Sequence, residues 1–569
     1  MDAARLSAEI ARARAAVAAR AYAEAGAIAA ALLRDDPACL DALEIKAIAA
    51  EAGGDVASAE AALRTAVAAA PGRRWPYDDL GRLLLRQGRR DEAEAVARAA
   101  VAADGDNPDA HAMLGSLLAE REALVAGAAH LERAISLAGR HPDLLARLGG
   151  ALARQGRLDE ARPLLAEALA AAPDSLAALT RLAEVEERAG AFAAASALLD
   201  RAERVAARSG RDVLLQRSVL MQRMGRAADA LALLDRRNDL SGAARLQRGR
   251  LRDATGRHAE AWDDFVAGKA QLARASGRHY AADEVAARAG ALARFFTAER
   301  LARLPRASVR RDVPQPLFVL GFPRSGTTLT EQLLASHSQI RAGGELPFGR
   351  DLADFATALV GGPALFPDGL ARMTAADHAH WPALLRDHYL AQAEAVGLLA
   401  PGAAFFTDKM PLNDMWLALL RLAFPEAPVV LVRRHPLDVL VSVMAHDMTH
   451  GFHCGYRLED AARHLALIDD LVARYQAAGI LVTHELGYEA LVADQAGETD
   501  RLMAAVGLAV EPAQRRFHES RRIAPTPSYA QVQAPLNDRS IGRWRHHDDR
   551  LAPIRDIVAG AIARGGYTA

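Results

Sequence analysis

The sequence has very little cysteine. Only Cys39 and Cys454 occur in the 569 residues, and they stand far apart in the chain. A disulfide framework and a cysteine-rich zinc site are both excluded, because each needs several suitably spaced thiols.

Long apolar runs and an excess of one charge are also absent. No stretch of about 18 consecutive apolar residues occurs, so no membrane-spanning helix is expected. The N-terminal stretch MDAARLSAEIARARAA is interrupted by charges every few positions, which excludes the apolar core of a secretory signal, and we expect a cytoplasmic protein. The 70 basic and 71 acidic residues give a net charge of −1. The overall charge therefore gives no reason to expect nucleic-acid binding.

A 34-residue period runs through the first half of the chain. It is marked by Leu80-Gly81, Leu114-Gly115, Leu148-Gly149 and Leu182-Ala183. Within a unit, apolar residues recur at helical spacing, Gly156 separates two helices, and Pro173 ends the second. This pattern resembles the tetratricopeptide repeat, and about seven or eight units cover roughly residues 5–285.

Stacked repeats of this kind bury a continuous core and leave a concave surface. That surface either binds a peptide or protein, or serves as a scaffold or dimerisation arm. Residues 289–305 predict one further helix, and the stretch RASVRRDVPQP predicts a linker. We predict a tetratricopeptide-repeat domain over 1–290, a helix and linker over 291–314, and a second domain over 315–569 that folds alone.

The second half alternates short apolar stretches with helical ones. Strands are predicted at 316–322, 403–409, 427–434 and near the start of 479–491. Continuous apolar strands separated by helices predict a parallel sheet covered on both faces. In such a P-loop-like α/β domain, ligands bind at the carboxyl ends of the strands.

The loop GFPRSGTT follows the first of these strands and precedes a helix. Gly321, Gly326 and Thr328 occupy Walker A positions, but Thr327 stands in place of the lysine. The free N–H groups of the following helix favour an anion here, although an ordinary tight turn is the alternative. Without the lysine and an obvious acidic Mg²⁺ ligand, NTP hydrolysis is disfavoured. Arg324 and Lys409 offer replacement cations.

A second anion site is predicted at the end of the third strand. Arg434 ends the strand, Pro436 begins a helix, and Ser442 follows on that helix. A guanidinium and a hydroxyl so placed can bind a phosphate, although a surface salt bridge fits this segment equally well. Two anion sites at one sheet edge favour a nucleotide with phosphates at both ends.

These motifs, together with GGEL and the tail YAQVQAPLNDRSIGRW, resemble the sulfotransferase superfamily over about residues 315–560. The resemblance implies 3′-phosphoadenosine 5′-phosphosulfate (PAPS) as sulfuryl donor and no metal. The combination with repeats is similar to bacterial tetratricopeptide-repeat sulfotransferases, whose catalytic half is most similar to protein-tyrosine sulfotransferases. The resemblance therefore implies a transferase.

The resemblance also implies roles for individual residues. Glu345 is the expected general base, 21 residues beyond Arg324, and Lys409 and Ser528 assist the departing phosphate. A carboxylate that merely favours a helix N-terminus is the alternative for Glu345. The residues expected to bind the donor are Arg324, Ser325, Gly326, Thr327 and Thr328 at the 5′-phosphosulfate, Arg434 and Ser442 at the 3′-phosphate, Tyr488 near the adenine, and Arg543 in the tail. Gln533 and Ala534 depart from the basic residue that many relatives carry there.

Two histidine-rich stretches invite other interpretations. His446, His450, His453 and Cys454 lie close in sequence but lack a second ligand pair for zinc, and we expect His446 to line the donor or acceptor pocket. The stretch RHHDD is expected to form a solvated turn.

Three functions remain open beside a P-loop kinase, which a requirement for Mg²⁺ and ATP would distinguish. The first is sulfation of a tyrosine in a peptide or protein recruited by the repeats. The second is sulfation of a glycan, lipid or small hydroxyl compound, and the third is an interaction protein whose second domain is catalytically idle. No nucleic-acid partner is expected, and a homodimer is left open.

Overall fold

The computed structural model describes residues 3–120, 124–374, 379–448, 452–480, 483–520, 532 and 534–568. The chain forms two compact units, Met1–Leu182 and Ala183–Ala569. The predicted helical repeats and the predicted parallel α/β domain are both confirmed.

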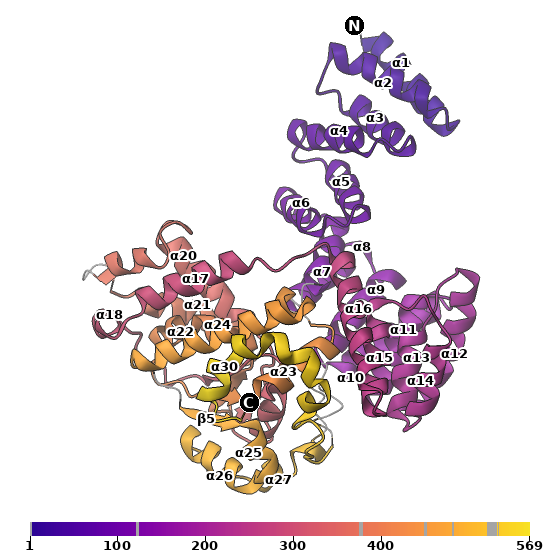
Figure 1. Ribbon diagram of the computed structural model, residues 1–569. Coiled ribbons are helices and arrows are strands. Elements are labelled where there is room, and N and C mark those ends of the chain that lie inside the picture. The colour runs from indigo at the N-terminus through magenta and orange to yellow at the C-terminus, as the bar shows by residue number, and fades with distance from the viewer. Residues whose placement is uncertain are drawn as a thin grey trace. The chain divides into compact units, whose positions relative to one another are not determined.

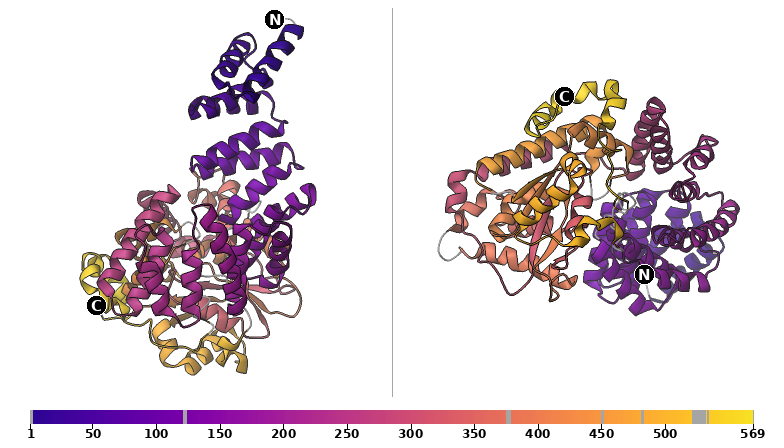
Figure 2. Two further views of the ribbon diagram at one scale, coloured as in Figure 1. Left: turned by 90° about the vertical axis from the view of Figure 1, so that its right-hand side faces the viewer. Right: turned by 90° about the horizontal axis from the view of Figure 1, so that it is seen from below.

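The first unit consists of consecutive helices that pack in pairs, such as α7 on α8 and α9 on α10 (Figure 1; Figure 2, left). The helices are α1 (Ala3–Ala18), α2 (Tyr22–Asp35), α3 (Leu40–Ala52), α4 (Val56–Ala69), α5 (Arg74–Arg86), α6 (Arg90–Ala103), α7 (Pro108–Glu120), α8 (Leu124–Ala138), α9 (Pro142–Arg154), α10 (Leu158–Ala171) and α11 (Leu176–Arg188), whose last residues belong to the second unit.

The glycines that mark the period have the structural roles expected of them. A Cβ atom on Gly115 would lie 2.8 Å from the carbonyl oxygen of Gly127 on the paired helix, so only glycine permits this close packing. Gly156 has φ 79° and joins α9 to α10 in the left-handed conformation. The repeat spacing thus follows from backbone constraints as well as apolar periodicity.

The second unit begins with further helices before it reaches the sheet. They are α12 (Phe192–Arg208), α13 (Leu214–Arg223), α14 (Ala227–Asp235), α15 (Gly242–Ala254), α16 (His258–Ser276), α17 (Ala282–Phe295) and α18 (Ala298–Arg303). The single helix predicted over 289–305 is wrong. The chain leaves α17 at Phe296, and Thr297 starts α18 by accepting a hydrogen bond from the backbone N–H of Arg300 at 3.3 Å.

Five parallel strands form the sheet, in the order β2-β3-β1-β4-β5. They are β1 (Gln315–Leu320), β2 (Ile340–Arg341), β3 (Phe405–Asp408), β4 (Val429–Arg433) and β5 (His484–Gly487). In this register Gln315 lies opposite Phe405, and Phe318 lies opposite Val429. The four predicted strands are confirmed, whereas the two-residue β2 was not predicted because it is too short to give a sequence pattern.

Both faces of the sheet are covered, so its strands are apolar at successive positions. Phe318 and Leu320 pack into the cluster formed with α17, α20, α21, α22 and α24, whereas Leu317 and Val319 pack into the cluster formed with α19 and α26. The remaining α-helices are α19 (Thr327–Leu334), α20 (Phe348–Leu359), α21 (Trp381–Ala395), α22 (Leu417–Ala423), α23 (Pro436–Ala445), α24 (Leu458–Ala477), α25 (Tyr488–Ala493), α26 (Gln495–Val506), α27 (Pro512–Arg515), α29 (Asp548–Leu551) and α30 (Arg555–Arg564).

The last repeat helices share a hydrophobic core with the α/β domain. Trp262 and Phe265 of α16 and Leu246 of α15 belong to one buried cluster with Leu440 of α23 and Trp544. The division between compact units therefore falls inside the repeats, near residue 182, and not at the end of the repeats near 290.

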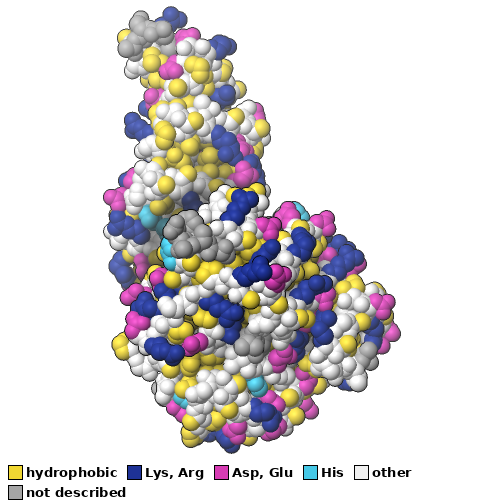
Figure 3. All heavy atoms as spheres, turned by 90° about the vertical axis from the view of Figure 1, so that its left-hand side faces the viewer, with side chains coloured by type: hydrophobic (Ala, Val, Ile, Leu, Met, Phe, Trp, Pro, Cys, Tyr) yellow, Lys and Arg dark blue, Asp and Glu magenta, His cyan; other side chains and the backbone are white. Residues whose placement is uncertain are grey.

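None of the described helices is both long and apolar enough to cross a membrane. On the face in Figure 3, Lys and Arg side chains are interspersed with Asp and Glu side chains. The charge on this face is therefore mixed, as the net charge of −1 leads one to expect.

Candidate active site

The loop between β1 and α19 has a constrained backbone. Arg324 has φ 73°, which is unusual for a residue other than glycine, and Gly326 has φ 111°. A Cβ atom on Gly326 would lie 2.8 Å from Cδ2 of Tyr488. Strained positions of this kind concentrate at ligand sites, and here the strain turns the loop over the N-terminus of α19.

The Arg324 side chain is held by the helix that follows β4. Its Nε donates to Oγ of Ser442 at 3.0 Å, and its Nη2 lies 3.5 Å from Nε2 of His446. Nδ1 of His446 lies 2.8 Å from the carbonyl oxygen of Ser442, which can only accept, so Nδ1 carries the proton and Nε2 accepts from Arg324. Burial and the positive charge of Arg324 hold the pKa of His446 well below its ordinary value, consistent with a neutral ring.

Arg434 connects the loop to the tail of the chain. Its Nη1 donates to the carbonyl oxygen of Arg324 at 3.0 Å, and its Nη2 donates to the carbonyl oxygen of Ser540. Its guanidinium lies over the ring of Tyr488, 4.7 Å from the ring centre, in a cation–π arrangement. The structure thus brings together Arg324, Arg434, Ser442 and Tyr488, four of the residues that the resemblance assigns to the donor.

Several guanidinium groups repel one another at this edge of the sheet. Burial, together with the charges of Arg434, Arg250 and Arg543, lowers the pKa of Arg324 to about 9. Burial also lowers the pKa of Arg434. A bound anion would raise both pKa values, because its negative charge offsets the repulsion between the cations.

Glu345 and Lys409 form a buried ion pair. Lys409 follows β3 and is fully buried, whereas the Glu345 side chain is 19% exposed; Nζ of Lys409 donates to Oε1 of Glu345. The described residues account for one of the three N–H donors of the lysine ammonium. The pair therefore joins a candidate base to a candidate stabiliser of negative charge.

Glu331 of α19 fixes the loop that carries Glu345. Its Oε1 accepts from the backbone N–H of Gly344 at 2.8 Å and from the hydroxyl of Thr407 at 2.7 Å. The hydroxyl oxygen of Thr407 in turn accepts from the backbone N–H of Gly343 at 3.0 Å. The sequence analysis missed Glu331, whose burial within α19 becomes visible only in the structure.

The tail is held by a second carboxylate that the sequence analysis missed. Oδ2 of Asp438 accepts from the backbone N–H of Gly542 at 2.7 Å, and its Oδ1 accepts from that of Trp544 at 2.9 Å. The Arg543 side chain pairs with Asp253 of α15. Ser528 and Gln533 lie outside the described residues.

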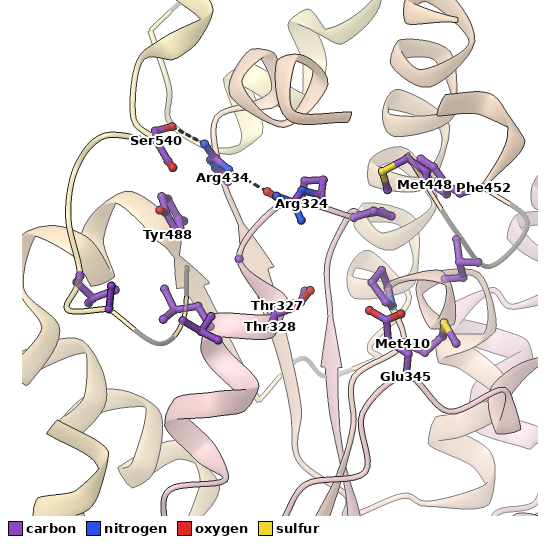
Figure 4. Close-up of a pocket in the computed structure, with 18 of the residues that line it drawn as sticks. Arg324, Thr327, Thr328, Glu345, Met410, Arg434, Met448, Phe452, Tyr488 and Ser540 are labelled. Atoms are coloured by element: carbon purple, nitrogen blue, oxygen red, sulfur yellow. Dashed lines mark hydrogen bonds between the residues drawn. The ribbon is translucent and has the colours of Figure 1, made fainter. Parts of the chain in front are cut away.

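A cavity opens between these groups (Figure 4). Arg434 and Tyr488 lie on one side of it, and Glu345, Met410, Met448 and Phe452 lie on the other. The predicted residues that line it are Arg324, Gly326, Thr327, Thr328, Glu345, Arg434 and Tyr488, together with Ala534 of the tail. Ser325, Lys409 and Ser442 are buried, and Arg543 is not among the lining residues.

In the second stretch, His546 is exposed, as expected of a solvated segment, but His547 is buried. Nε2 of His547 hydrogen-bonds Oδ1 of Asp253 at 3.0 Å, and that oxygen also lies 2.8 Å from Nδ1 of His258. In the part of the chain that the structure describes, Asp253, His258 and His547 are the one His/Cys/carboxylate group with metal-ligand proximity. The guanidinium of Arg543 on the same carboxylate opposes a dication there. His450, from the other histidine stretch, is not among the described residues.

Residues 316–512 match the sulfotransferase family. Residues 50–117 and 152–213 match one tetratricopeptide-repeat family, and residues 10–74 match another. An uncharacterized protein of Aquifex aeolicus (strain VF5) is 30% identical over 262 residues, which cover 43% of this chain and 32% of the relative. The chain thus spans about a third of the length of that curated relative.

Two similar solved structures are tetratricopeptide-repeat proteins. One, from Parabacteroides merdae ATCC 43184, is 20% identical, with 41% of this chain and 93% of that chain covered and a TM-score of 0.36. The other, the C-terminal part of a repeat-containing protein from Cytophaga hutchinsonii, is 15% identical, with 45% and 94% covered and a TM-score of 0.30. From its family matches, this chain joins tetratricopeptide repeats to a domain of the sulfotransferase family.

Proposed function

We propose that the protein transfers a sulfuryl group from PAPS to an acceptor hydroxyl. The observation that carries the proposal is the convergence of a strained phosphate-type loop, mutually repelling guanidiniums and the Glu345–Lys409 pair at one cavity. Among the described residues, Oγ of Ser325 and Nε of Arg434 are buried without a hydrogen-bond partner. One atom belongs to the loop after β1 and the other to the residue that follows β4, and two unpartnered groups on neighbouring strand ends suit a ligand with two anionic groups.

The donor would lie along the carboxyl edge of the sheet. We assign the 3′-phosphate to Arg434 and Ser442, and the adenine to the neighbourhood of Tyr488. The 5′-phosphosulfate is assigned to the loop and the start of α19, namely Arg324, Ser325, Gly326, Thr327 and Thr328, where backbone N–H groups and the helix dipole favour an anion. Arg543 is assigned to the closing tail, where its positive charge adds to the field at Arg324.

In the reaction, Glu345 accepts the proton of the acceptor hydroxyl while that oxygen forms its bond to sulfur. The bond from sulfur to the bridging oxygen breaks, and the electron pair stays on the phosphate. Lys409 donates a hydrogen bond to that oxygen and so stabilises the charge that develops on it. Ser528 is proposed to assist there, although it lies outside the described residues.

The pairing of Glu345 with Lys409 serves both roles. One ammonium proton already bonds the carboxylate, and the other donors remain for the departing oxygen. The same ammonium keeps the carboxylate next to the reacting atoms, so that general-base catalysis and leaving-group stabilisation act at one place. No step of this scheme uses a metal ion.

We propose a tyrosine of a peptide or protein as acceptor. The side of the cavity that carries Glu345 is lined by Met410, Met448 and Phe452, an apolar surface that suits an aromatic ring better than a sugar (Figure 4). The repeats supply a surface for recruiting the polypeptide. A glycan, lipid or small hydroxyl compound is the alternative acceptor.

The test is incubation of the full-length protein with ³⁵S-labelled PAPS and a lysate of the source cells, followed by mass spectrometry of the labelled species. We expect label on tyrosine, unaffected by EDTA and lost in the Lys409→Met variant. Label on a glycan or small molecule would replace the proposed acceptor. An absence of both transfer and 3′-phosphoadenosine 5′-phosphate binding would favour an interaction protein with an idle second domain.

A further inference from the structure

Lysine is rare in this chain, and one lysine of the repeats is buried against the α/β domain. Only Lys46, Lys269 and Lys409 occur, among 70 basic residues. Lys269 of α16 is 1% exposed, and its Nζ donates to the carbonyl oxygen of His446 at 2.6 Å. Burial lowers the pKa of Lys269 to about 8. A buried ammonium is costly unless a specific interaction requires it, which points to a role beyond packing.

Arg250 of α15 makes the neighbouring contact. Its Nη1 donates to the carbonyl oxygen of Ala445 at 2.8 Å. Ala445 and His446 stand at the C-terminal end of α23, where helix carbonyls lack intrahelical partners and cations are favoured. Two cations from the last repeat therefore fix the end of the helix that carries Ser442. The carboxylate of Asp447 interacts favourably with both cations.

The contact continues into the candidate active site. The backbone of His446 is held by Lys269, and the imidazole of the same residue bonds the carbonyl oxygen of Ser442 and faces Nη2 of Arg324. The carbonyl oxygen of Arg324 is bonded by Arg434. An unbroken path of hydrogen bonds thus runs from the repeat helix through His446 to both arginines of the proposed donor site.

The last repeat holds the tail as well. Asp253 of α15 pairs with Arg543 and accepts a hydrogen bond from His547. Both residues belong to the tail segment 540–547, in which the carbonyl oxygen of Ser540 accepts a hydrogen bond from Arg434. The α15–α16 pair therefore contacts the site through two separate segments, the end of α23 and the segment 540–547. A scaffold that only supports the α/β domain would need neither the buried lysine nor the polar contacts to these two segments.

We propose that α15 and α16 are an integral part of the donor site, in which Lys269 and Arg250 are positioning residues that orient His446 and, through it, Arg324. This inference rests on the proposed function, since it assumes that Arg324 and Arg434 bind the donor. It means that donor affinity depends on the order of the last repeat, so the repeats contribute to the reaction site in addition to any role in recruitment.

The first test measures the Kd of 3′-phosphoadenosine 5′-phosphate by calorimetry on the full chain. Lys269→Met should weaken binding about tenfold, in line with the loss of one charge-assisted hydrogen bond. Lys46→Met in α3 and Arg274→Met, on the exposed face of α16, are matched controls and should bind as the wild type does. Failure of the wild type itself to bind would refute the proposed function before the inference is reached.

A double-mutant cycle separates positioning from stability. If Lys269 acts through His446, then Lys269→Met in a His446→Ala background should weaken binding less than twofold further. Independent, multiplicative losses would overturn the path through His446. A lower melting temperature with unchanged Kd in Lys269→Met and in Arg250→Gln would show that the contacts only support the fold.

The second test uses the wild-type protein and does not depend on a variant folding. Hydrogen exchange is measured with and without 3′-phosphoadenosine 5′-phosphate. Protection should rise in residues 244–272 of α15 and α16 as well as in the loop 321–328, and should stay unchanged in α3 and α4. Protection confined to the loop and to α23 would overturn the inference, whatever the variants do.

Discussion

Replacing Glu345 by glutamine tests the chemistry most directly. The amide keeps the size of the side chain and can still accept a hydrogen bond from Lys409, but it cannot take a proton near neutral pH. General-base catalysis contributes about 10²–10⁴ in rate, so the turnover number should fall by that factor, equivalent to roughly 3–5 kcal/mol of barrier. Donor affinity should change much less, because the donor contacts are assigned to other residues.

The buried pair adds a second expectation for the same variant. Lys409 is fully buried and Glu345 is 19% exposed, so the amide leaves the ammonium with a neutral partner. The free energy of unfolding should fall by about 1–3 kcal/mol, the difference between a charged and a neutral hydrogen-bond partner. Binding of an anionic donor supplies the missing charge, so 3′-phosphoadenosine 5′-phosphate should raise the melting temperature of the variant more than that of the wild type.

The assay is single-turnover transfer from ³⁵S-labelled PAPS to the acceptor found in the labelling experiment, with thermal unfolding measured in parallel. Glu299→Gln is the matched control, because Glu299 is 76% exposed and pairs with Arg303 one helical turn away. A folded Glu345→Gln protein that keeps more than about a tenth of the wild-type rate would refute the base assignment. His446 would not replace it readily, since its ring already bonds Ser442 and faces Arg324.

Three further predictions follow from other parts of the structure. Arg434→Ala should reduce the preference for 3′-phosphoadenosine 5′-phosphate over AMP by about tenfold or more, which corresponds to the loss of one charge-assisted hydrogen bond. In calorimetry, equal weakening of binding for both nucleotides would contradict the 3′-phosphate assignment. Burial raises the pKa of Asp414 to about 7, whereas an unfolded aspartate has a pKa near 4. Between these two pH values the folded state keeps a proton that the unfolded state has released, so the free energy of unfolding falls as pH rises from about 4 to about 7. Asp414→Asn can keep an acceptor for the backbone N–H of Gly321 and should be more stable than the wild type by on the order of 2–4 kcal/mol at pH 8, but not at pH 4, in urea unfolding; equal stability at pH 8 would contradict this. Deletion of residues 1–182 should leave donor binding intact and impair transfer to a polypeptide acceptor. Deletion of residues 1–290 should abolish donor binding, because it removes α15 and α16 from a shared core; a truncated 291–569 protein that binds the donor with the wild-type Kd would show that this core is dispensable.

The sequence by itself determined the repeat period, the strands that flank the loop and the residue types of the anion sites. Each depends on short-range rules: apolar periodicity gives helices and strands, and Gly156 separates two helices because it tolerates a left-handed backbone. The loop at 321–328 could be predicted to bind an anion because its glycines, its hydroxyls and the helix that follows are contiguous in the sequence. The rule that ligands bind at strand carboxyl ends was then enough to predict that Lys409 and Arg434 lie at one edge of the sheet. Glu345 was expected there only from the family resemblance, because the short strand before it was not predicted.

Only the tertiary structure decided how these groups pair and what supports them. The bond from Lys409 to Glu345, the bond from Arg324 to Ser442 and the support of Glu331 under the GGEL loop join positions 13 to 118 residues apart. The contact of Lys269 with His446 spans 177 residues and crosses the boundary that the sequence pattern placed at 290. A repeat pattern reports which face of a helix is apolar but not which surface covers it. The packing of α15 and α16 on α23 was therefore set by long-range complementarity, which local spacing does not encode.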